Sequence, residues 1–353
     1  MECRRCLLTD RESQIIDGVC DFCRMHDELS GLNEAWLENL VGKLRGKKGY
    51  QVLIGISGGL DSSYLLWFTV KVLKLKPLVI HFNNRWNDPI AVHNMALLID
   101  KLGVDFRQYT SDDEYDRLCG AFLKAGVKDL DIPNDVYMTE LMRRVAVETG
   151  VKYGFNGHDF RSEGSTPLGW TYMDAKYIRS VYKRYAGRKL KTFLNYTFWN
   201  QIKSAFAGIR QIRVFHYFNV PDSDKRNTML DFGWMDYGEK HGENIYTKFV
   251  GYYMLPKRWG IDKRVVYLSA QIRDKRITKG QARLQLRLPV EVDESCFSSI
   301  YARTGASVTE ALVAPKQTYK DFDHYKFKRW KPLLWVMMKL KLTSYHFYKK
   351  YTA

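Results

Sequence analysis

The middle of the chain alternates short apolar runs with segments of helical periodicity, which predicts strands that are each followed by a helix. The predicted strands cover residues 51–56, 77–82, 104–109 and 152–157. The predicted helices cover residues 62–75, 88–102 and 136–149, and the last two end at Gly103 and Gly150. Because the two kinds of element alternate regularly, we expect an α/β domain with a parallel, Rossmann-like sheet and helices on both faces.

Helical periodicity also appears on either side of this alternating region. Leu32, Trp36, Leu40 and Leu44 recur at helical spacing and predict an amphipathic helix over residues 29–47. A late helix is predicted over Ile277–Leu288, with Thr278 as its N-cap. We expect three parts: a knuckle over 1–28, the α/β domain over 29–164, and a mainly helical region over 165–353. The second and third parts could also form one continuous domain.

The composition is that of a folded, globular protein. Of 353 residues, 45% are apolar and 14% are aromatic, which allows a sizeable core. No apolar stretch approaches the roughly 20 residues that are needed to span a bilayer. The N-terminal residues do not lead into an apolar signal segment. We therefore expect a cytoplasmic protein.

The net charge of +17 favours anionic partners. From Lys176 to Arg213 the chain carries ten basic residues and no acidic one. This stretch suits a nucleotide-linked substrate, but it could also be a solvated basic surface. The tail after Lys316 is basic and aromatic, which leaves contact with a membrane surface open beside helix packing or a partner contact.

Four of the six cysteines lie in the first 23 residues as two Cys-x-x-Cys pairs, Cys3 with Cys6 and Cys20 with Cys23. Two such pairs supply four thiolates for a tetrahedral Zn²⁺ ion and leave no open position, so we expect a structural metal site. An iron–sulfur cluster or a redox dithiol pair are the alternatives. The nearby Arg4, Arg5 and Arg24 could offset the negative charge of the site.

The strongest local motif is Ser57–Ser63, with the sequence Ser-Gly-Gly-Leu-Asp-Ser-Ser. It follows a predicted strand and opens a helix, where free backbone N–H groups and the helix dipole favour a phosphate group. Gly58 and Gly59 allow the backbone to approach an anion closely. Asp61 would repel bare phosphate, so a bridging Mg²⁺ ion is its expected partner. No lysine closes the loop, so it is not a Walker loop.

This motif resembles the phosphate loop of the PP-loop pyrophosphatases, which include asparagine, GMP and NAD synthetases and tRNA-thiolating enzymes. The resemblance implies that ATP is split between its α and β phosphates and that AMP passes to a carbonyl oxygen. It also implies that the ends of the second and fourth predicted strands border the nucleotide. The implied ATP-binding residues are Ser57, Gly58, Gly59, Asp61, Ser62, Ser63, His81, Phe82, Asn83, Gly157 and His158.

Later segments resemble the N-acetyl sugar amidotransferases of bacterial surface-polysaccharide biosynthesis, such as the O-antigen and pseudaminic acid pathways. They are Leu230–Glu243, Ile245–Phe249 and Leu255–Arg264, together with Phe155–Asp159 and the cysteine pairs. The resemblance implies that ATP adenylates an acetamido oxygen of a nucleotide-linked sugar and that ammonia then gives an acetamidino group. It further implies a separate glutaminase subunit and a cyclase-like subunit that channels ammonia.

The chemistry of this reaction selects candidate catalytic residues. Asp61 is one, and cations must offset the charge that develops as the amide oxygen attacks phosphorus, for which Lys240, Lys263 and Arg264 are available. His241 and Glu243 could relay protons or orient the acceptor. Each could also be an ordinary surface residue. Two other functions stay open: a tRNA-thiolating enzyme, and a zinc protein that binds nucleic acid without catalysis. The intact phosphate loop argues against the second of these functions, and we do not expect nucleic acid as a partner.

Overall fold

The computed structural model describes residues 1–167, 170–238, 242–290, 294, 297–340 and 348. The chain forms two compact units, and each combines separate stretches of sequence. The first comprises Met1–Ser111, Tyr153–Gly169 and Gln211–Ile300, and the second comprises Asp112–Lys152, Trp170–Arg210 and Tyr301–Ala353. Within the described ranges, every helix is too short or too polar to cross a membrane.

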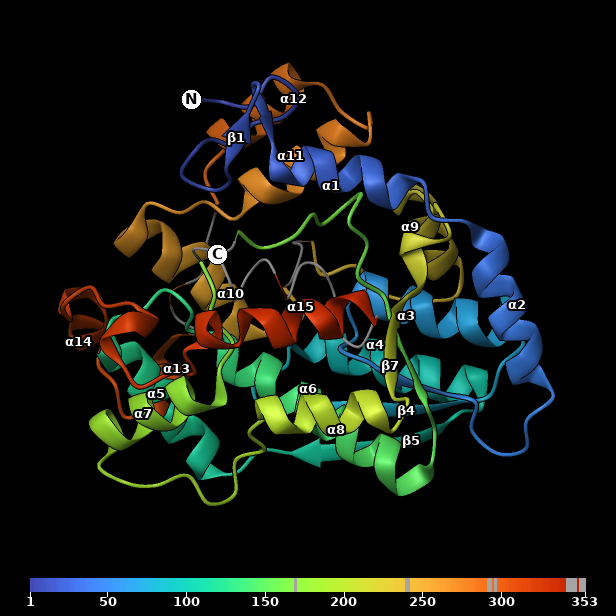
Figure 1. The fold of residues 1–353 in the computed structure, drawn as a ribbon, viewed down its shortest axis with the longest axis horizontal. Helices are drawn as coiled ribbons and strands as arrows, with labels where there is room; N and C mark the ends of the chain where they lie inside the picture. Colours follow the sequence, from blue (N-terminus) through green and yellow to red (C-terminus); the bar gives the residue numbers. More distant parts are fainter. Residues whose placement is uncertain (168–169, 239–241, 291–293, 295–296, 341–347, 349–353) are drawn as a thin grey trace. The chain divides into compact units, whose positions relative to one another are not determined.

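A five-stranded sheet organises the first unit, in the order β5-β4-β3-β6-β7 (Figure 1). Its strands are β3 (Val52–Gly55), β4 (Pro77–Asn83), β5 (Asp105–Thr110), β6 (Tyr153–Asn156) and β7 (Arg210–Arg213). The pairs β3–β4, β3–β6 and β4–β5 are parallel, and Ile54 pairs with both Val79 and Phe155. The predicted fold class is therefore confirmed, with β7 as a strand that the sequence did not predict.

The strand order places a topological switch point between β3 and β6. From β3 the chain builds β4 and β5 on one side of the sheet and then returns to build β6 on the other side. In open parallel sheets, ligands bind outside the carboxyl ends of the strands at such a point. The Ser57–Ser63 loop follows β3 and lies at this position.

Helices and a short hairpin complete the first unit. They are β1 (Ile15–Ile16), β2 (Val19–Cys20), α1 (Asp21–Ser30), α2 (Glu34–Arg45), α3 (Leu60–Trp67), α4 (Pro89–Leu102), α9 (Asp222–Asp231), α10 (Ile245–Lys248), α11 (Arg264–Arg273) and α12 (Lys279–Arg287). π-Helical segments extend α3 over Phe68–Val72 and α10 over Phe249–Trp259. As predicted, Thr278 caps α12, and α4 ends at Gly103 in a left-handed conformation.

The apolar face of α2 differs from the prediction. Leu37, Val41 and Leu44 are buried, whereas Leu32 and Trp36 are 37% and 48% exposed. Leu32 precedes the helix, which begins at Glu34 after the cap residue Asn33. Packing against the core therefore selects a face shifted by one residue from the predicted one. Trp36 stacks on Tyr217 at the surface instead.

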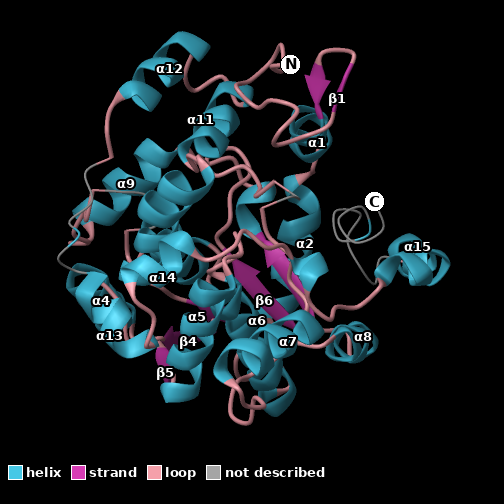
Figure 2. Cartoon of the chain, turned by 90° about the vertical axis from the view of Figure 1, so that its left-hand side faces the viewer, coloured by secondary structure: helices cyan, strands magenta, loops and turns pink. Residues whose placement is uncertain are grey.

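The second unit is helical in its described residues. It contains α5 (Asp113–Ala125), α6 (Ile132–Thr149), α7 (Ala175–Ala186), α8 (Phe198–Phe206), α14 (Val308–Val313) and α15 (Lys331–Lys339), while α13 (Phe297–Thr304) crosses the boundary between the units (Figure 2). Its connections are fixed by buried acids: Glu114 accepts hydrogen bonds from the backbone N–H groups of Lys191, Thr192 and Phe193. This agrees with the expected mainly helical C-terminal region.

Candidate functional site

The phosphate-type loop turns tightly between β3 and α3. The Ser57 N–H donates to Ser62 Oγ at 3.2 Å, and Ser62 Oγ donates to the Gly59 carbonyl oxygen at 3.1 Å. Gly59 is the N-cap residue of α3 and has no side chain to satisfy the first N–H groups of the helix. Such an N-terminus attracts anions. The hydroxyl of Ser63, by contrast, is fully buried and has no hydrogen-bond partner in the described part of the chain.

Two glycines, which lack a Cβ atom, allow the loop to pack closely against its neighbours. Gly58 has φ +81°, and a Cβ atom there would lie 2.1 Å from the Ala91 carbonyl oxygen of α4. Its own carbonyl oxygen accepts from Trp234 Nε1 at 3.0 Å. A Cβ atom at Gly157 would lie 2.8 Å from the Asp61 carbonyl oxygen. The end of β6 therefore packs directly against the start of α3.

The end of β4 is held to the end of β3 by His81. Its Nδ1–H donates to the Ile56 carbonyl oxygen at 2.9 Å, and its Nε2 accepts from Asn87 Nδ2 at 2.9 Å. Burial lowers the pKa of His81, so the imidazole is neutral and both nitrogens are used. Phe82 is buried, and the Asn83 side chain accepts from the Arg85 N–H. These three predicted residues thus lie beside the loop, with His81 and Phe82 largely enclosed.

His158 lies at the end of β6 and faces a second histidine. Its Nδ1 is 3.4 Å from Nε2 of His216, and its backbone N–H donates to Asn156 Oδ1. Burial, followed by the charge of Arg213, lowers the pKa of His216 to about 2. His216 is therefore neutral, and His158, which is partly exposed, is the member of the pair that can meet a ligand.

A buried lysine that the sequence analysis did not identify neutralises Asp61. Lys225, on α9, is fully buried, and its Nζ donates to Asp61 Oδ1 at 2.9 Å and to Asp159 Oδ2 at 3.1 Å. Asp222 Oδ1 lies 3.6 Å from the same nitrogen. Burial alone would lower the pKa of Lys225, but the three carboxylates raise it overall, so the side chain stays charged.

Further ion pairs connect Lys225 and its carboxylate partners with residues near the N-terminus. Arg276 lies 3.4 Å from Asp222 and donates to Asp274 at 2.8 Å. Asp274 Oδ1 in turn lies 3.3 Å from Nε2 of His26 on α1. Arg161 is 3.8 Å from Asp274 and 4.0 Å from Asp159. A continuous set of charged side chains thus connects Asp61 with the helix that carries Cys23.

Glu243 contacts the loop from the later part of the chain. Its Oε1 accepts from Ser57 Oγ at 3.3 Å, and its Oε2 accepts from the Tyr237 hydroxyl at 3.2 Å. A Cβ atom at Gly59 would meet both side chains at 3.0–3.1 Å. Burial raises the pKa of Glu243, which favours its neutral form beside an anion-binding loop.

The raised pKa of Glu243 predicts a pH-dependent stability. Ionisation of Glu243 is less favourable in the folded state than in the unfolded state. Its contribution to the free energy of unfolding is therefore complete below the unfolded pKa near 4.5 and is lost as pH rises through the folded pKa. Relative to wild type, Glu243→Gln should therefore become more stable as pH rises through this window. Thermal unfolding at a series of pH values measures the difference. Glu38→Gln alters an exposed glutamate and is the control, for which we expect a stability difference from wild type that does not vary with pH. The same pH-independent difference in Glu243→Gln would contradict the prediction.

The remaining candidates have other surroundings. Lys263 is the N-cap residue of α11, with its aliphatic side chain near Gly251. Arg264 pairs with Asp262 at 2.8 Å and donates to the Leu288 carbonyl oxygen at the end of α12. Its described contacts join two helices. Lys240 and His241 lie outside the described residues.

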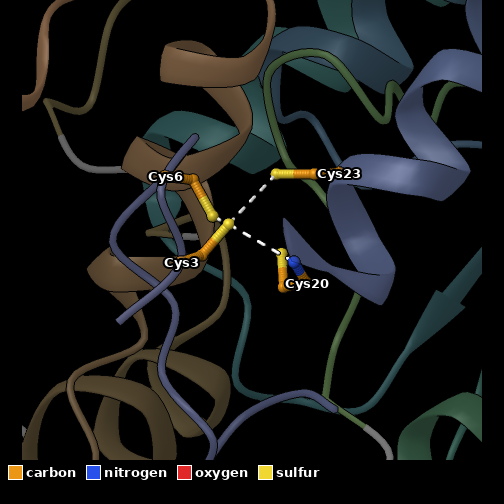
Figure 3. Close-up of side chains that lie close together, drawn as sticks. All are labelled: Cys3, Cys6, Cys20 and Cys23. Atoms are coloured by element: carbon orange, nitrogen blue, oxygen red, sulfur yellow. Dashed lines mark hydrogen bonds between the residues drawn. The ribbon is translucent and has the colours of Figure 1, made fainter. Parts of the chain in front are cut away.

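The four N-terminal cysteines converge as predicted. Cys3 and Cys6 come from the first loop, and Cys20 and Cys23 come from the start of α1, with their sulfurs facing one another (Figure 3). All four are buried, and their Sγ atoms lie within 4.8 Å of one another. The Cys3–Cys23 and Cys6–Cys20 sulfur distances are 3.7 and 3.6 Å. Tetrahedral Zn–S bonds of ~2.3 Å separate sulfurs by about 3.8 Å, so the donor set fits a metal ion.

The pKa values of three thiols in this knuckle are shifted in opposite directions. Hydrogen bonds from Cys20 and Cys23 lower the pKa of Cys6 most, and the charge of Arg273 lowers it further. The pKa values of Cys20 and Cys23 are raised. A bound metal ion would remove this conflict by stabilising all four thiolates.

The knuckle is fastened to α11 and α12, and all three are drawn near the top of Figure 1. The Leu7 N–H donates to Ser269 Oγ at 3.2 Å. Lys279 Nζ donates to the Cys3 carbonyl oxygen at 2.7 Å. Leu7 also packs with Leu268 and Ala282 in a small apolar cluster.

Comparison with known proteins finds a family model that matches the later part of the chain. Residues 243–341 match the family model of the LPS biosynthesis protein WbpG-like C-terminal domain. This confirms the resemblance to polysaccharide-biosynthesis proteins for that stretch, which includes Glu243 and α11. No curated protein matches the chain.

Several solved structures are similar to this chain at low sequence identity. NMN synthetase from Francisella tularensis is 12% identical, with 82% of this chain and 98% of that chain covered and a TM-score of 0.37. The U34-tRNA thiolase NcsA from Methanococcus maripaludis, with its [4Fe-4S] cluster, is 14% identical over 89% and 96%, with a TM-score of 0.34. NH3-dependent NAD synthetase from Campylobacter jejuni is 11% identical over 62% and 100%, with a TM-score of 0.29. With TM-scores below 0.5, these likenesses add nothing to the fold described above.

Proposed function

We propose that this protein is an ATP-dependent, AMP-forming sugar amidotransferase of LPS biosynthesis. In the proposed reaction the acetamido oxygen of a nucleotide-linked sugar attacks the α-phosphate of ATP and releases pyrophosphate. Ammonia then adds to the activated carbon, and AMP leaves, which gives an acetamidino group. The single observation that supports this most is a glycine-rich anion loop at the switch point of the sheet, in a chain whose later part matches an LPS biosynthesis domain.

The residues around the loop have distinct tasks in this proposal. Gly58, Gly59 and the first N–H groups of α3 bind the departing pyrophosphate. Neutral Glu243 can lie near an anion without repelling it, and its contact with Ser57 fixes the loop. Partly exposed His158 is placed to contact the nucleotide from the end of β6. Lys225 pairs with Asp61 and Asp159 and orients both carboxylates at the same edge.

Two metal ions belong to the proposal. The carboxylates of Asp61 and Asp159 share one cation, Lys225, and oxygen donors of this kind suit Mg²⁺, which would supply positive charge to offset the phosphates when bound. The knuckle would hold a structural Zn²⁺ ion, because four buried thiols at near-tetrahedral separations leave no position for a substrate. Loading the protein under anaerobic conditions with iron and sulfide, and comparing metal content, distinguishes zinc from an iron–sulfur cluster.

The partners are inferred from the chemistry. We propose that a separate glutaminase supplies ammonia and that a cyclase-like subunit channels it. The basic stretch from Lys176 to Arg213 would favour a nucleotide-linked substrate. We also propose that the C-terminal tail makes a peripheral contact with a membrane, because Trp335, Val336 and Leu340 are exposed there among lysines. We further propose that the reaction takes place in the cytoplasm.

The test is a coupled measurement of AMP and product mass. Metal-loaded protein is incubated with ATP, an ammonium salt and a panel of nucleotide-linked diacetamido sugars. We expect AMP only when sugar is present, together with a product about one mass unit lighter, because oxygen is replaced by NH. If AMP is released with tRNA and a sulfur donor in the absence of sugar, the proposal is wrong and the protein is a tRNA-thiolating enzyme.

A further inference from the structure

One buried arginine near the cysteine knuckle has no carboxylate partner. Arg273, the last residue of α11, is only 6% exposed. Its Nε and Nη1 atoms are buried and have no hydrogen-bond partner among the described residues. No described carboxylate forms an ion pair with it, whereas Asp274 and Arg276 in the same turn are well paired. A buried, unpaired charge is costly, and such a group requires an explanation.

Arg273 lies beside Phe22 of the knuckle, and its Nη2 atom is also close to Gly164, where a Cβ atom would lie 3.1 Å from it. Its guanidinium carbon is 6.0 Å from the ring centre of Phe22, which directly precedes Cys23. Ser269, one helical turn earlier on the same face of α11, accepts the hydrogen bond from the Leu7 N–H, next to Cys6.

Of the three arginines that are close to the cysteines in sequence, Arg4 is exposed and donates to the Asp17 carbonyl oxygen, and the other two are paired with carboxylates. Arg5 forms a two-point ion pair with Asp27 at 2.6 Å, and Arg24 pairs with Asp21 at 2.5 Å. Their side chains are 40% and 37% exposed, so solvent screens what remains of their charge. Neither arginine supplies an uncompensated positive charge to the interior.

A metal ion bound by the four thiolates of the knuckle would form a negatively charged centre, and this centre could pair with Arg273. A divalent metal ion with four thiolates carries a net charge of about −2, and burial makes that charge expensive unless a cation is near. We propose that Arg273 is the buried counter-charge of the four-cysteine metal centre and that it raises the affinity of the centre for metal. The charge of the centre likewise accounts for an arginine without a carboxylate.

The inference rests on the proposed metal site and is independent of ATP and sugar. It is tested with Co²⁺ as a spectroscopic probe, because tetrahedral thiolate coordination gives strong absorption, followed by competition with Zn²⁺ and a chromophoric chelator. The full chain is compared with Arg273→Met and Arg273→Lys. Arg5→Met and Arg24→Met are matched controls, since each removes one arginine near the knuckle that is already paired. Circular dichroism of the metal-loaded proteins checks folding.

We expect Arg273→Met to weaken Co²⁺ and Zn²⁺ binding by about 10–100-fold, the usual effect of residues that support metal ligands. Arg273→Lys, which keeps the charge, should lose less than about 3-fold, as should both controls. Equal affinity of wild type and Arg273→Met would overturn the inference. An Arg273→Lys variant as weak as Arg273→Met would also overturn it, since shape and not charge would then matter. If Arg273→Met does not fold, the lysine variant decides: retained affinity supports the role, and a tenfold loss contradicts it.

Failure of the metal site itself has a different signature. Wild-type protein without a tetrahedral thiolate spectrum would overturn the metal assignment and this inference together. Loss of sugar-dependent AMP formation would leave both untouched, because metal affinity is measured without nucleotide.

Discussion

Lys225→Met is expected to remove nearly all ATP-dependent AMP formation and to lower the free energy of unfolding by about 3–5 kcal/mol. The lysine is fully buried, and its ammonium group lies between Asp61 and Asp159 at 2.9 and 3.1 Å. Methionine has a similar length but no charge, so the variant leaves neighbouring carboxylates without their shared cation. Repulsion then favours protonation of one of them, and Asp61 loses its fixed position beside the loop.

Two controls separate this role from simple loss of charge. Lys76→Met removes an exposed lysine that pairs with Asp105 at 3.4 Å, and it should change stability by less than about 1 kcal/mol. Lys225→Arg keeps the charge and should recover part of the activity. The pH profile of AMP formation distinguishes positioning from general destabilisation: in Lys225→Met, residual activity should fall on the acid side at a higher pH than in wild type. Activity of Lys225→Met within about threefold of wild type would refute the role, because a loss of about 100-fold is typical for such electrostatic groups.

The sheet was predictable where local patterns agree with burial. The strands β3, β4 and β6 are short apolar runs, and α4 has sequence signals at both ends, Asp88 as N-cap and Gly103 as C-cap. β7 has no such signal, because Arg-Gln-Ile-Arg buries only Ile212. The buried face of α2 depends on which residues the core accepts, and a single helix pattern does not contain that information. The division at residues 28 and 164 stays a prediction.

The candidate site was predictable mainly where its residues belong to a local motif or to a segment that carries a family resemblance, as Glu243 does. The Ser57–Ser63 loop and the cysteine pairs carry their chemistry in their spacing. Lys225 is 164 positions from Asp61 and lies in a helix whose sequence, Asp-Ser-Asp-Lys-Arg-Asn-Thr-Met-Leu-Asp, is mostly polar and typical of a solvent-exposed segment. Arg273 is likewise an ordinary basic residue until α11 is folded against the knuckle. Charges that are far apart in sequence become partners only through the fold, so the sequence pointed to Arg4, Arg5 and Arg24 as possible counter-charges instead.

Gly58→Ala is expected to abolish measurable ATP binding and to lower the thermal unfolding midpoint more than a comparable glycine substitution elsewhere. The left-handed backbone at φ +81° alone costs an alanine roughly 1–2 kcal/mol. The added methyl group would also lie 2.1 Å from the Ala91 carbonyl oxygen, which is backbone and cannot rotate away. The loop must therefore move by about an ångström, and a displacement of that size at a reacting group can reduce rate by about 100-fold.

Gly103→Ala is the matched control for this prediction. Gly103 also has a left-handed backbone, at φ +59°, but no atom lies within 4 Å of a Cβ atom built there. It should therefore show the backbone cost alone, with ATP binding unchanged. ATP affinity is measured by calorimetry on both variants, and thermal unfolding is followed by circular dichroism. If Gly58→Ala bound ATP as tightly as Gly103→Ala, the loop could not be the phosphate site, because its shape would be irrelevant to the ligand. Selective loss at Gly58 would instead mean that the close approach of the loop to α4 fixes the backbone N–H groups on which pyrophosphate binding depends.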